Sequence, residues 1–246
     1  MAVVKKRFDI VVGERYPQYS RQQIQSWIMQ GKILVDGQPQ TKPGVLVHED
    51  VPLTLNVEEP KYVGRAGFKL EKALEHFGIA VEGLVILDAG ISTGGFTDCL
   101  LQHGAKKVYG IDVGYGQVHE KIAQDDRVIV RERTNLRDLT DLEELVDMVT
   151  LDLSFISVLK VMDAVCALLK PDGKLVILIK PQFESERKDI GRGGIIKDPA
   201  VHDAAIKKVV EGVGHYGFTF KGVVASPIEG AMGNKEFLAY FVRNQA

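Results

Sequence analysis

The chain contains Leu87-Asp88-Ala89-Gly90-Ile91-Ser92-Thr93-Gly94-Gly95-Phe96, the stretch that decides its fold. An apolar run over 84–87 ends in Asp88, three glycines follow between positions 90 and 95, and a helix-like run begins at Phe96. A strand, a glycine-rich turn and a helix in this order bring backbone N–H groups close to a ligand at a helix N-terminus. The stretch therefore predicts a ligand-binding unit of an α/β fold.

A second acidic residue indicates the kind of ligand. Asp112 ends the next apolar run, where a carboxylate accepts hydrogen bonds from ribose hydroxyls, so we expect a nucleoside. The loop reads Gly-x-x-x-Gly-Gly, which differs from the Gly-x-Gly-x-x-Gly of dinucleotide binders and lacks the Gly-Lys-Ser/Thr of a phosphate loop. S-adenosylmethionine has no pyrophosphate, so the loop favours this cofactor. A dinucleotide or a purely structural turn are the alternatives.

The composition is that of a soluble globular protein. Hydrophobic residues make up 45% of the 246 residues and charged residues 26%. We find no apolar run long enough for a membrane span and no signal peptide, and we expect no membrane partner. Cys99 and Cys166 lie in apolar helical patterns and are expected to be reduced, buried thiols of a cytoplasmic protein. No Cys/His cluster has metal-ligand spacing, so no metal is expected.

The N-terminal segment has a charge balance of its own. Residues 1–48 hold seven lysines and arginines and three acidic residues, so their net charge is 7 − 3 = +4. This excess suggests a polyanionic partner. The pattern predicts helices over Arg7–Arg15 and Arg21–Gln30, the second capped by Ser20, and then a small β-layer from 33–35 and 51–57. We predict domains at 1–57 and 63–246, with a linker at 58–62.

The second segment alternates between strands and helices. A helix is expected over 66–77. The predicted strands are 84–88, 107–112, 128–131, 147–152, 174–180, 219–225 and 237–243, and the predicted helices between them are 96–103, 117–124, 140–145, 157–169 and 200–216. Alternation with apolar strands predicts an open, mostly parallel sheet covered on both faces, which binds ligands beyond the carboxyl ends of its strands. The polar stretch 183–199 is a candidate lid or substrate loop.

Charged residues stand at several predicted strand ends. Asp152 and Lys180 each follow an apolar strand, and Glu236 opens the last one. A lysine at the end of an apolar strand is costly unless it is paired or functional, so a salt bridge from Lys180 to Asp152 or Glu236 is the plain structural alternative. Lys69, on the helix before the sheet, would by itself be an ordinary surface lysine. We expect Phe96 and Phe155 to pack rather than to stack on a base.

These motifs together resemble a known family. Ser92-Thr93-Gly94-Gly95-Phe96, Asp152-Leu153-Ser154-Phe155-Ile156-Ser157, Lys180-Pro181-Gln182-Phe183-Glu184 and Gly233-Asn234-Lys235-Glu236-Phe237 are similar to motifs of the TlyA family, once called hemolysin A. That family resembles FtsJ-type ribosomal-RNA 2′-O-ribose methyltransferases. Residues 7–57 resemble the alpha-L RNA-binding domain of small ribosomal-subunit protein four. The resemblance implies a Rossmann-like class I methyltransferase sheet with a small N-terminal α+β domain.

The resemblance also assigns residues. It implies a catalytic tetrad of Lys69, Asp152, Lys180 and Glu236. It implies an S-adenosylmethionine pocket at Gly90, Ser92, Gly94, Gly95, Phe96, Asp112, Asn135 and Asp152. The RNA contacts expected on the first domain are Arg7, Ser20, Arg21, Lys32 and Lys42, with ribosomal RNA or a ribosomal subunit as partner.

The chemistry then required is an in-line transfer of a methyl group from a sulfonium to a ribose 2′-hydroxyl. Lys180 is the candidate to receive or steer the hydroxyl proton, or to stabilise the developing alkoxide as a cation. Two other functions stay open. The first is a membrane-damaging hemolysin, which would make liposomes leak. The second is a catalytically inactive RNA-binding or ribosome-assembly protein, which would incorporate no labelled methyl group into RNA.

Overall fold

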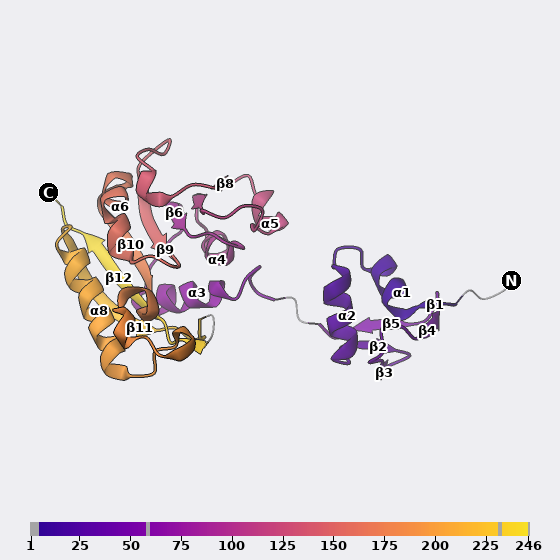
Figure 1. The fold of residues 1–246 in the computed structure, drawn as a ribbon. Helices are drawn as coiled ribbons and strands as arrows, with labels where there is room; N and C mark the ends of the chain where they lie inside the picture. Colours follow the sequence, from indigo (N-terminus) through magenta and orange to yellow (C-terminus); the bar gives the residue numbers. More distant parts are fainter. Residues whose placement is uncertain (1–4, 58–59, 231–232, 246) are drawn as a thin grey trace. The chain divides into compact units, whose positions relative to one another are not determined.

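The computed structural model describes residues 5–57, 60–230 and 233–245. The chain forms two compact units, Met1–Lys61 and Tyr62–Ala246 (Figure 1). The linker predicted at 58–62 lies partly outside the described residues, and the division between the units falls directly after Lys61.

The first unit is a small α+β domain whose two helices were predicted to within one residue. Helix α1 (Phe8–Arg15) packs on α2 (Arg21–Met29). Helix α2 begins after Ser20, which forms a reciprocal capping box with Gln23, so the first-turn N–H groups gain partners. Strand β1 (Lys5–Arg7) pairs with β4 (Leu46–His48), and β2 (Ile33–Val35) lies between β3 (Gln38–Pro39) and β5 (Leu53–Leu55).

A seven-stranded sheet forms the centre of the second unit. Its strands are β6 (Val85–Ala89), β7 (Lys107–Ile111), β8 (Val128–Arg131), β9 (Val146–Leu151), β10 (Leu169–Ile179), β11 (Phe218–Ala225) and β12 (Phe237–Arg243). The order is β11-β12-β10-β9-β6-β7-β8. Strands β6 to β10 pair in parallel, and β12 is antiparallel to both of its neighbours. The predicted open, mostly parallel sheet is therefore confirmed.

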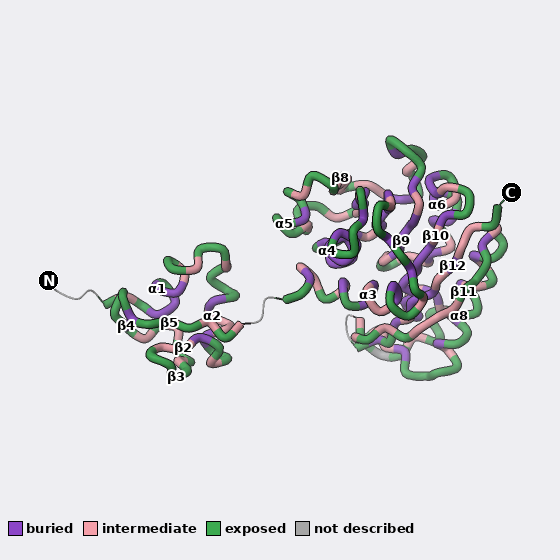
Figure 2. Tube along the Cα trace, turned by 180° about the vertical axis from the view of Figure 1, so that it is seen from behind, coloured by how far each residue is buried: buried purple, intermediate pink, exposed green. Residues whose placement is uncertain are grey.

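Helices cover both faces of this sheet. The helices are α3 (Ala66–Phe77), α4 (Gly95–Gln102), α5 (Glu120–Ala123), α6 (Met162–Leu168), α7 (Pro181–Glu184) and α8 (Pro199–Gly214). Alternate strand residues such as Ile86 and Leu87 enter two separate cores, one shared with α3, α4 and α5 and the other with α6 and α8. The central strands β6 and β9 are buried along almost their whole length, whereas β8 and β11 at the sheet edges are more exposed (Figure 2). Both faces are apolar because a parallel sheet carries helices on each side.

Three predicted helices differ from the structure. Residues 140–145 form no helix, because Glu143 and Glu144 turn to Lys107 and the segment is too short to be stable alone. The helix expected at 117–124 is reduced to α5. The helix expected at 157–169 is a 3-10 turn, η2 (Val158–Val161), followed by α6, and β10 begins already at Leu169.

The predicted substrate loop, 183–199, is not structureless. It contains the end of α7 and the 3-10 turns η3 (Arg187–Asp189) and η4 (Arg192–Gly194). Of the two cysteines, Cys99 is buried and Cys166 is half-buried rather than buried as predicted. No helix in the described ranges has the length and apolar character needed to span a membrane.

Candidate active site

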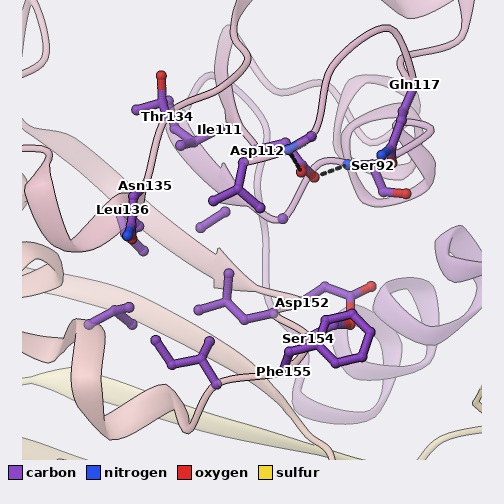
Figure 3. A pocket seen from close by; sticks show the side chains of 17 residues that line it. Ser92, Ile111, Asp112, Gln117, Thr134, Asn135, Leu136, Asp152, Ser154 and Phe155 are labelled. Atoms are coloured by element: carbon purple, nitrogen blue, oxygen red, sulfur yellow. Dashed lines mark hydrogen bonds between the residues drawn. The ribbon is translucent and has the colours of Figure 1, made fainter.

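A cavity of about 420 Å³ opens at the carboxyl ends of the central strands (Figure 3). After β6 the chain continues to β7 and β8 on one side of it, and later returns to β9 on the other side. The loop after β6 leads to α4 and the loop after β9 leads to α6, and these helices cover opposite faces of the sheet, so a crevice opens at this point, as expected for an open α/β sheet. The residues that line it include Gly90, Ser92, Ile111, Asp112, Gln117, Asn135, Leu136, Asp152, Ser154 and Phe155.

The glycine loop has a conformation that demands glycine at Gly90. Its φ is 89°, and a β-carbon there would stand 2.4 Å from the backbone oxygen of Asp152. The loops after β6 and β9 thus touch through their backbones. Ser92 also has a left-handed φ, 48°, which turns its N–H towards Asp112. The close approach of Gly90 to the Asp152 backbone and the hydrogen bond from Ser92 to Asp112 together fix the shape of the loop.

Both oxygens of Asp112 are held by backbone donors. Ser92 N–H donates to Oδ2 over 2.8 Å, and Gly114 N–H donates to Oδ1 over 2.7 Å (Figure 3). A carboxylate has further lone pairs beyond these two bonds. Asp112 is therefore fixed in orientation at the cavity wall and can still accept from ribose hydroxyls.

Asp88 lies fully buried beneath the loop. Thr97 Oγ1, on α4, donates to it over 2.6 Å, and Thr150 Oγ1, on β9, donates over 3.0 Å. Burial raises the pKa of Asp88 to about 6, against the lowering effect of these hydroxyl groups. Asp88 fastens β6 to the two elements that flank the loop.

A second cavity, of about 490 Å³, brings together the four residues of the expected tetrad. Lys180 Nζ lies 2.7 Å from Asp152 Oδ1 and donates to Ser154 Oγ over 2.9 Å. Lys69 Nζ lies 2.5 Å from Glu236 Oε2, and both side chains are buried. Lys69 is thus not the surface lysine that its sequence context suggested. The tetrad forms two separate lysine–carboxylate pairs.

The two cavities share Asp152, Ser154 and Phe155. Phe155 has a left-handed φ of 66° and is 90% exposed, so the prediction that it packs in the interior is wrong. Its ring centroid lies 5.3 Å from that of Phe183, which also lines the second cavity. In the sequence the ring stands three residues after Asp152, in Ser154-Phe155-Ile156, and this local pattern gives no clear signal for an exposed ring.

Glu184 connects the segment after Phe155 to the segment after Lys180. It is 2% exposed, and it accepts Ser157 Oγ–H over 2.6 Å and Val158 N–H over 2.8 Å. Burial raises its pKa. Since Glu184 ends α7, directly after the strand that carries Lys180, these bonds hold the Phe155 loop against the Lys180 segment.

Gln182 was not singled out by its sequence. It lines the second cavity, and among the described residues its Oε1 is a buried acceptor without a hydrogen-bond partner. Buried polar atoms of this kind are uncommon in folded proteins. By contrast, the amide of Asn234 is bonded to Gly194 O and Ile196 N–H.

The remaining residues expected in the cofactor pocket lie in different places. Asn135 lines the first cavity, and its Oδ1 accepts Arg137 N–H. Gly94 and Gly95 do not line it and instead begin α4, where a β-carbon would meet Ile122 or the backbone of Gly64. Phe96 is buried in the core and packs as expected.

Three of the expected RNA contacts gather at one place on the first unit. Arg7 and Arg21 both reach the carboxylate of Asp9, and Lys42 begins a turn tied to α1 by the bond from Asp9 N–H to Pro43 O. Ser20 serves as the helix cap. Lys32 lies beyond the other end of α2, away from Arg21. The described residues contain no cluster of metal-ligating side chains.

The switch-point cavity and the sheet with its single reversed strand define the class of the second unit, a Rossmann-like methyltransferase. A model of FtsJ-like methyltransferases matches residues 62–243, and a model of the S4 domain matches residues 6–51. The chain belongs to the FtsJ-like methyltransferase family and carries an S4 domain before the methyltransferase domain.

Relatives agree over nearly the whole chain. The 16S/23S rRNA (cytidine-2′-O)-methyltransferase TlyA of Mycobacterium tuberculosis is 41% identical over 239 residues, which cover 96% of this chain and 89% of that protein. Hemolysin A of Brachyspira hyodysenteriae is 40% identical over 237 residues, covering 95% and 98%. A solved structure of a candidate hemolysin from Streptococcus thermophilus is 38% identical, with a TM-score of 0.75 and coverage of 100% and 90%.

Proposed function

We propose that this protein transfers the methyl group of S-adenosylmethionine to a ribose 2′-hydroxyl in ribosomal RNA. The observation that carries the proposal is the junction of the two cavities at Asp152, Ser154 and Phe155, beside the Lys180–Asp152 pair. A methyl donor in the first cavity and a nucleotide in the second would meet there. The rRNA (cytidine-2′-O)-methyltransferase relative supports ribose in ribosomal RNA as the acceptor.

The first cavity fits S-adenosylmethionine. Asp112 presents an oriented carboxylate for the ribose hydroxyls, and Ile111 and Leu136 give apolar wall for the adenine. Gly90 lets the backbone approach the amino-acid end. The cofactor supplies a methyl group on a sulfonium, which is a good leaving group, so the protein has to align it and to assist the acceptor.

The second cavity fits a nucleotide taken out of its stack. The exposed ring of Phe155, with Phe183 beside it, offers a surface on which an unstacked base can lie. Gln182 adds a carboxamide whose buried oxygen lacks a partner. Bound there, the nucleotide would present its ribose to Lys180 and Asp152.

The lysine–carboxylate pairs would orient the hydroxyl and take its proton. Lys180 forms an ion pair with Asp152 and donates to Ser154 Oγ, and an ammonium has three N–H donors, so one can reach the 2′-oxygen. Transfer of the methyl group from the sulfonium to the 2′-oxygen would release the hydroxyl proton, which the Lys180–Asp152 pair would take up. The positive charge lost from the sulfonium is thus recovered on the pair. Lys69 and Glu236 would hold the other side of the ribose.

The first unit would bind RNA and take no part in the chemistry. Its arginines at 7 and 21 are exposed, and phosphate contacts of this kind give affinity with little choice of sequence. The methyltransferase domain would then select the nucleotide through the second cavity.

The test is to map 2′-O-methylation at nucleotide resolution in ribosomal RNA from cells with and without the protein. We expect a ribose methylation that is absent without the protein, restored by the wild type and by Lys174→Ala, and not restored by Asp152→Ala. Lys174 lies in the middle of β10, outside the lining of both cavities, and serves as control. Identical ribose maps in both strains would contradict the proposal.

A further inference from the structure

Asp9 is a buried carboxylate that contacts two arginines of the first unit. Its side chain has no exposed surface and stands in the first turn of α1. Arg7 binds it with two parallel bonds, Nε to Oδ1 and Nη2 to Oδ2, both of 3.0 Å. Arg21 Nη2, from the start of α2, lies 3.4 Å from Oδ2, and Gln25 Nε2 donates to the same oxygen over 2.9 Å.

The two guanidinium groups stay accessible although their carboxylate is covered. The side chains of Arg7 and Arg21 are 48% and 70% exposed. Each guanidinium carries five N–H donors, and Asp9 uses only two from Arg7 and one from Arg21. The remaining donors can bind a further anion.

The charge at this place is unbalanced, in contrast to its neighbour. Lys6 contacts two carboxylates, Glu14 and Glu49, each at 3.0 Å. Arg7 and Arg21 share one carboxylate, so the group keeps a net charge of about +1. This excess charge favours an anion at the arginine pair rather than at Lys6.

The backbone holds Arg7 in place from the other side. Phe8 N–H donates to Val45 O, and Asp9 N–H donates to Pro43 O. The guanidinium of Arg7 lies beside Gly44, 3.8 Å from where a β-carbon would stand. The arginine is therefore fixed between the turn and α1.

We propose that Asp9 is a positioning residue that holds Arg7 and Arg21 as a two-guanidinium clamp for the phosphate oxygens of RNA. The inference rests on the proposed RNA-binding function of the first unit. Guanidinium groups suit phosphate because two parallel N–H donors match two of its oxygens. A clamp that is already ordered spends less conformational entropy on binding than two free arginine side chains. The pKa of Asp9 is lowered to about 2, mainly by its bonds to Arg7, so it remains ionised in neutral solution.

The test is the Asp9→Asn variant of the full chain. An effect of net charge alone and a loss of arginine positioning predict opposite changes in RNA affinity for this variant. The substitution raises the net charge of the unit by one, so charge alone predicts tighter binding of RNA. The clamp predicts weaker binding, by about five- to tenfold, as one charge-assisted anchor is lost. Asp50→Asn makes the same change of charge at an exposed site of the same unit and serves as the matched control.

Affinity for purified ribosomal RNA is measured over a series of salt concentrations for wild type, both asparagine variants and Arg7→Ala/Arg21→Ala. Asp9→Asn is then combined with the two alanine changes. If Asp9 acts through the arginines, it should have little further effect in that background. Thermal unfolding and S-adenosylmethionine affinity, measured on the same samples, report any general loss of structure.

Folded Asp9→Asn that binds RNA as tightly as Asp50→Asn would overturn the positioning role. The positioning role would also be overturned if Asp9→Asn lowered RNA affinity by the same factor in the background that lacks both arginines. If the double-alanine variant itself bound RNA like the wild type, the RNA surface assigned to this unit would be wrong, and the clamp would fall with it. Ribose methylation by the second unit could still stand in that case.

Discussion

The two units use lysine, arginine and carboxylate side chains in opposite ways. In the second unit Lys180 has Asp152 and Lys69 has Glu236, so each buried cation has its own carboxylate. In the first unit Arg7 and Arg21 share Asp9. Pairs with one carboxylate for each lysine give a site of fixed geometry and little net charge, which suits the alignment of a hydroxyl and a methyl group. Two arginines that share one carboxylate keep a positive charge that can attract a polyanion.

Breaking a matched pair should have the largest effect. We expect Lys180→Ala to lower methyl transfer to RNA by about 10²–10⁴-fold, the usual contribution of a proton-transfer group, with both ligands still bound. Lys180→Arg should fail as well, because a planar guanidinium does not fit the position of an ammonium. Lys174→Ala, in the middle of β10 and outside the lining of both cavities, is the control.

The measurement combines methyl transfer, S-adenosylmethionine affinity and melting temperature on the same preparations. A Lys180→Ala variant that methylates at nearly the wild-type rate would remove the residue from the mechanism. Activity that is lost only in step with folding, and that arginine partly restores, would favour a structural salt bridge.

Asp88 offers a third case, a buried carboxylate that accepts from two hydroxyl groups and forms no ion pair within the described residues. Its pKa is raised to about 6 by burial, whereas that of Asp9, beside two arginines, is lowered to about 2. A raised carboxyl pKa means that the folded state binds the proton more tightly. The contribution to stability is therefore complete below the unfolded pKa of 3.8 and is lost as the pH rises through about 6.

We expect Asp88→Asn to remove this dependence. Relative to the asparagine variant, the free energy of unfolding of the wild type should increase by about 2 kcal/mol as the pH falls from 7 to 4. Urea unfolding of both proteins across that range measures the difference. If the difference in unfolding free energy between the two proteins stayed constant with pH, Asp88 would have the same proton affinity in the folded and unfolded states.

The carboxylate of Asp112 allows a test of whether cofactor binding in the first cavity depends on its charge. Asp112→Ala should weaken S-adenosylmethionine binding by about 1–3 kcal/mol, because hydrogen bonds to a carboxylate are lost. Calorimetry measures this affinity, with Asp126→Ala, an exposed aspartate, as control. Unchanged affinity in the folded variant would exclude Asp112 from the site, and tighter binding of NADH than of S-adenosylmethionine would exclude the cofactor.

The smallest expected effect is that of a single arginine of the shared pair. Arg21→Ala should weaken RNA binding on all sequences and lower the salt dependence, as the slope of log affinity against log salt, by about one. Cofactor affinity should not change, because the residue lies in the other unit. An unaltered salt slope would mean that Arg21 makes no phosphate contact.

Much of the site could be predicted because of how parallel sheets are built. Asp152, Lys180 and Glu236 stand at ends of strands that lie next to each other in the sheet, so sequence position predicted spatial proximity. The choice of partners could not be predicted, since β10 lies between β9 and β12 and Lys180 could have reached either acid. The burial of Lys69 depends on how α3 packs against β12, which the local sequence does not encode.

The other differences have local causes. Phe155 combines a 90% exposed side chain with a left-handed φ, which is rare for an aromatic residue and which the local sequence does not signal. Gly94 and Gly95 lie at the start of α4 and outside the lining of the first cavity, where a β-carbon would meet Ile122 or the 64–67 segment, and their contact with the cofactor stays a prediction. The motif was recognised correctly, yet only part of it faces the cavity.

The position of the transferred methyl group tests the central claim most directly. The purified protein is incubated with ribosomal subunits and S-adenosylmethionine labelled in its methyl group, and the RNA is digested completely with alkali. Alkali needs a free 2′-hydroxyl to cleave the adjacent phosphodiester, so ribose methylation predicts label in alkali-resistant dinucleotides. Label recovered in mononucleotides would place the methyl group on a base and contradict a site built around a ribose hydroxyl.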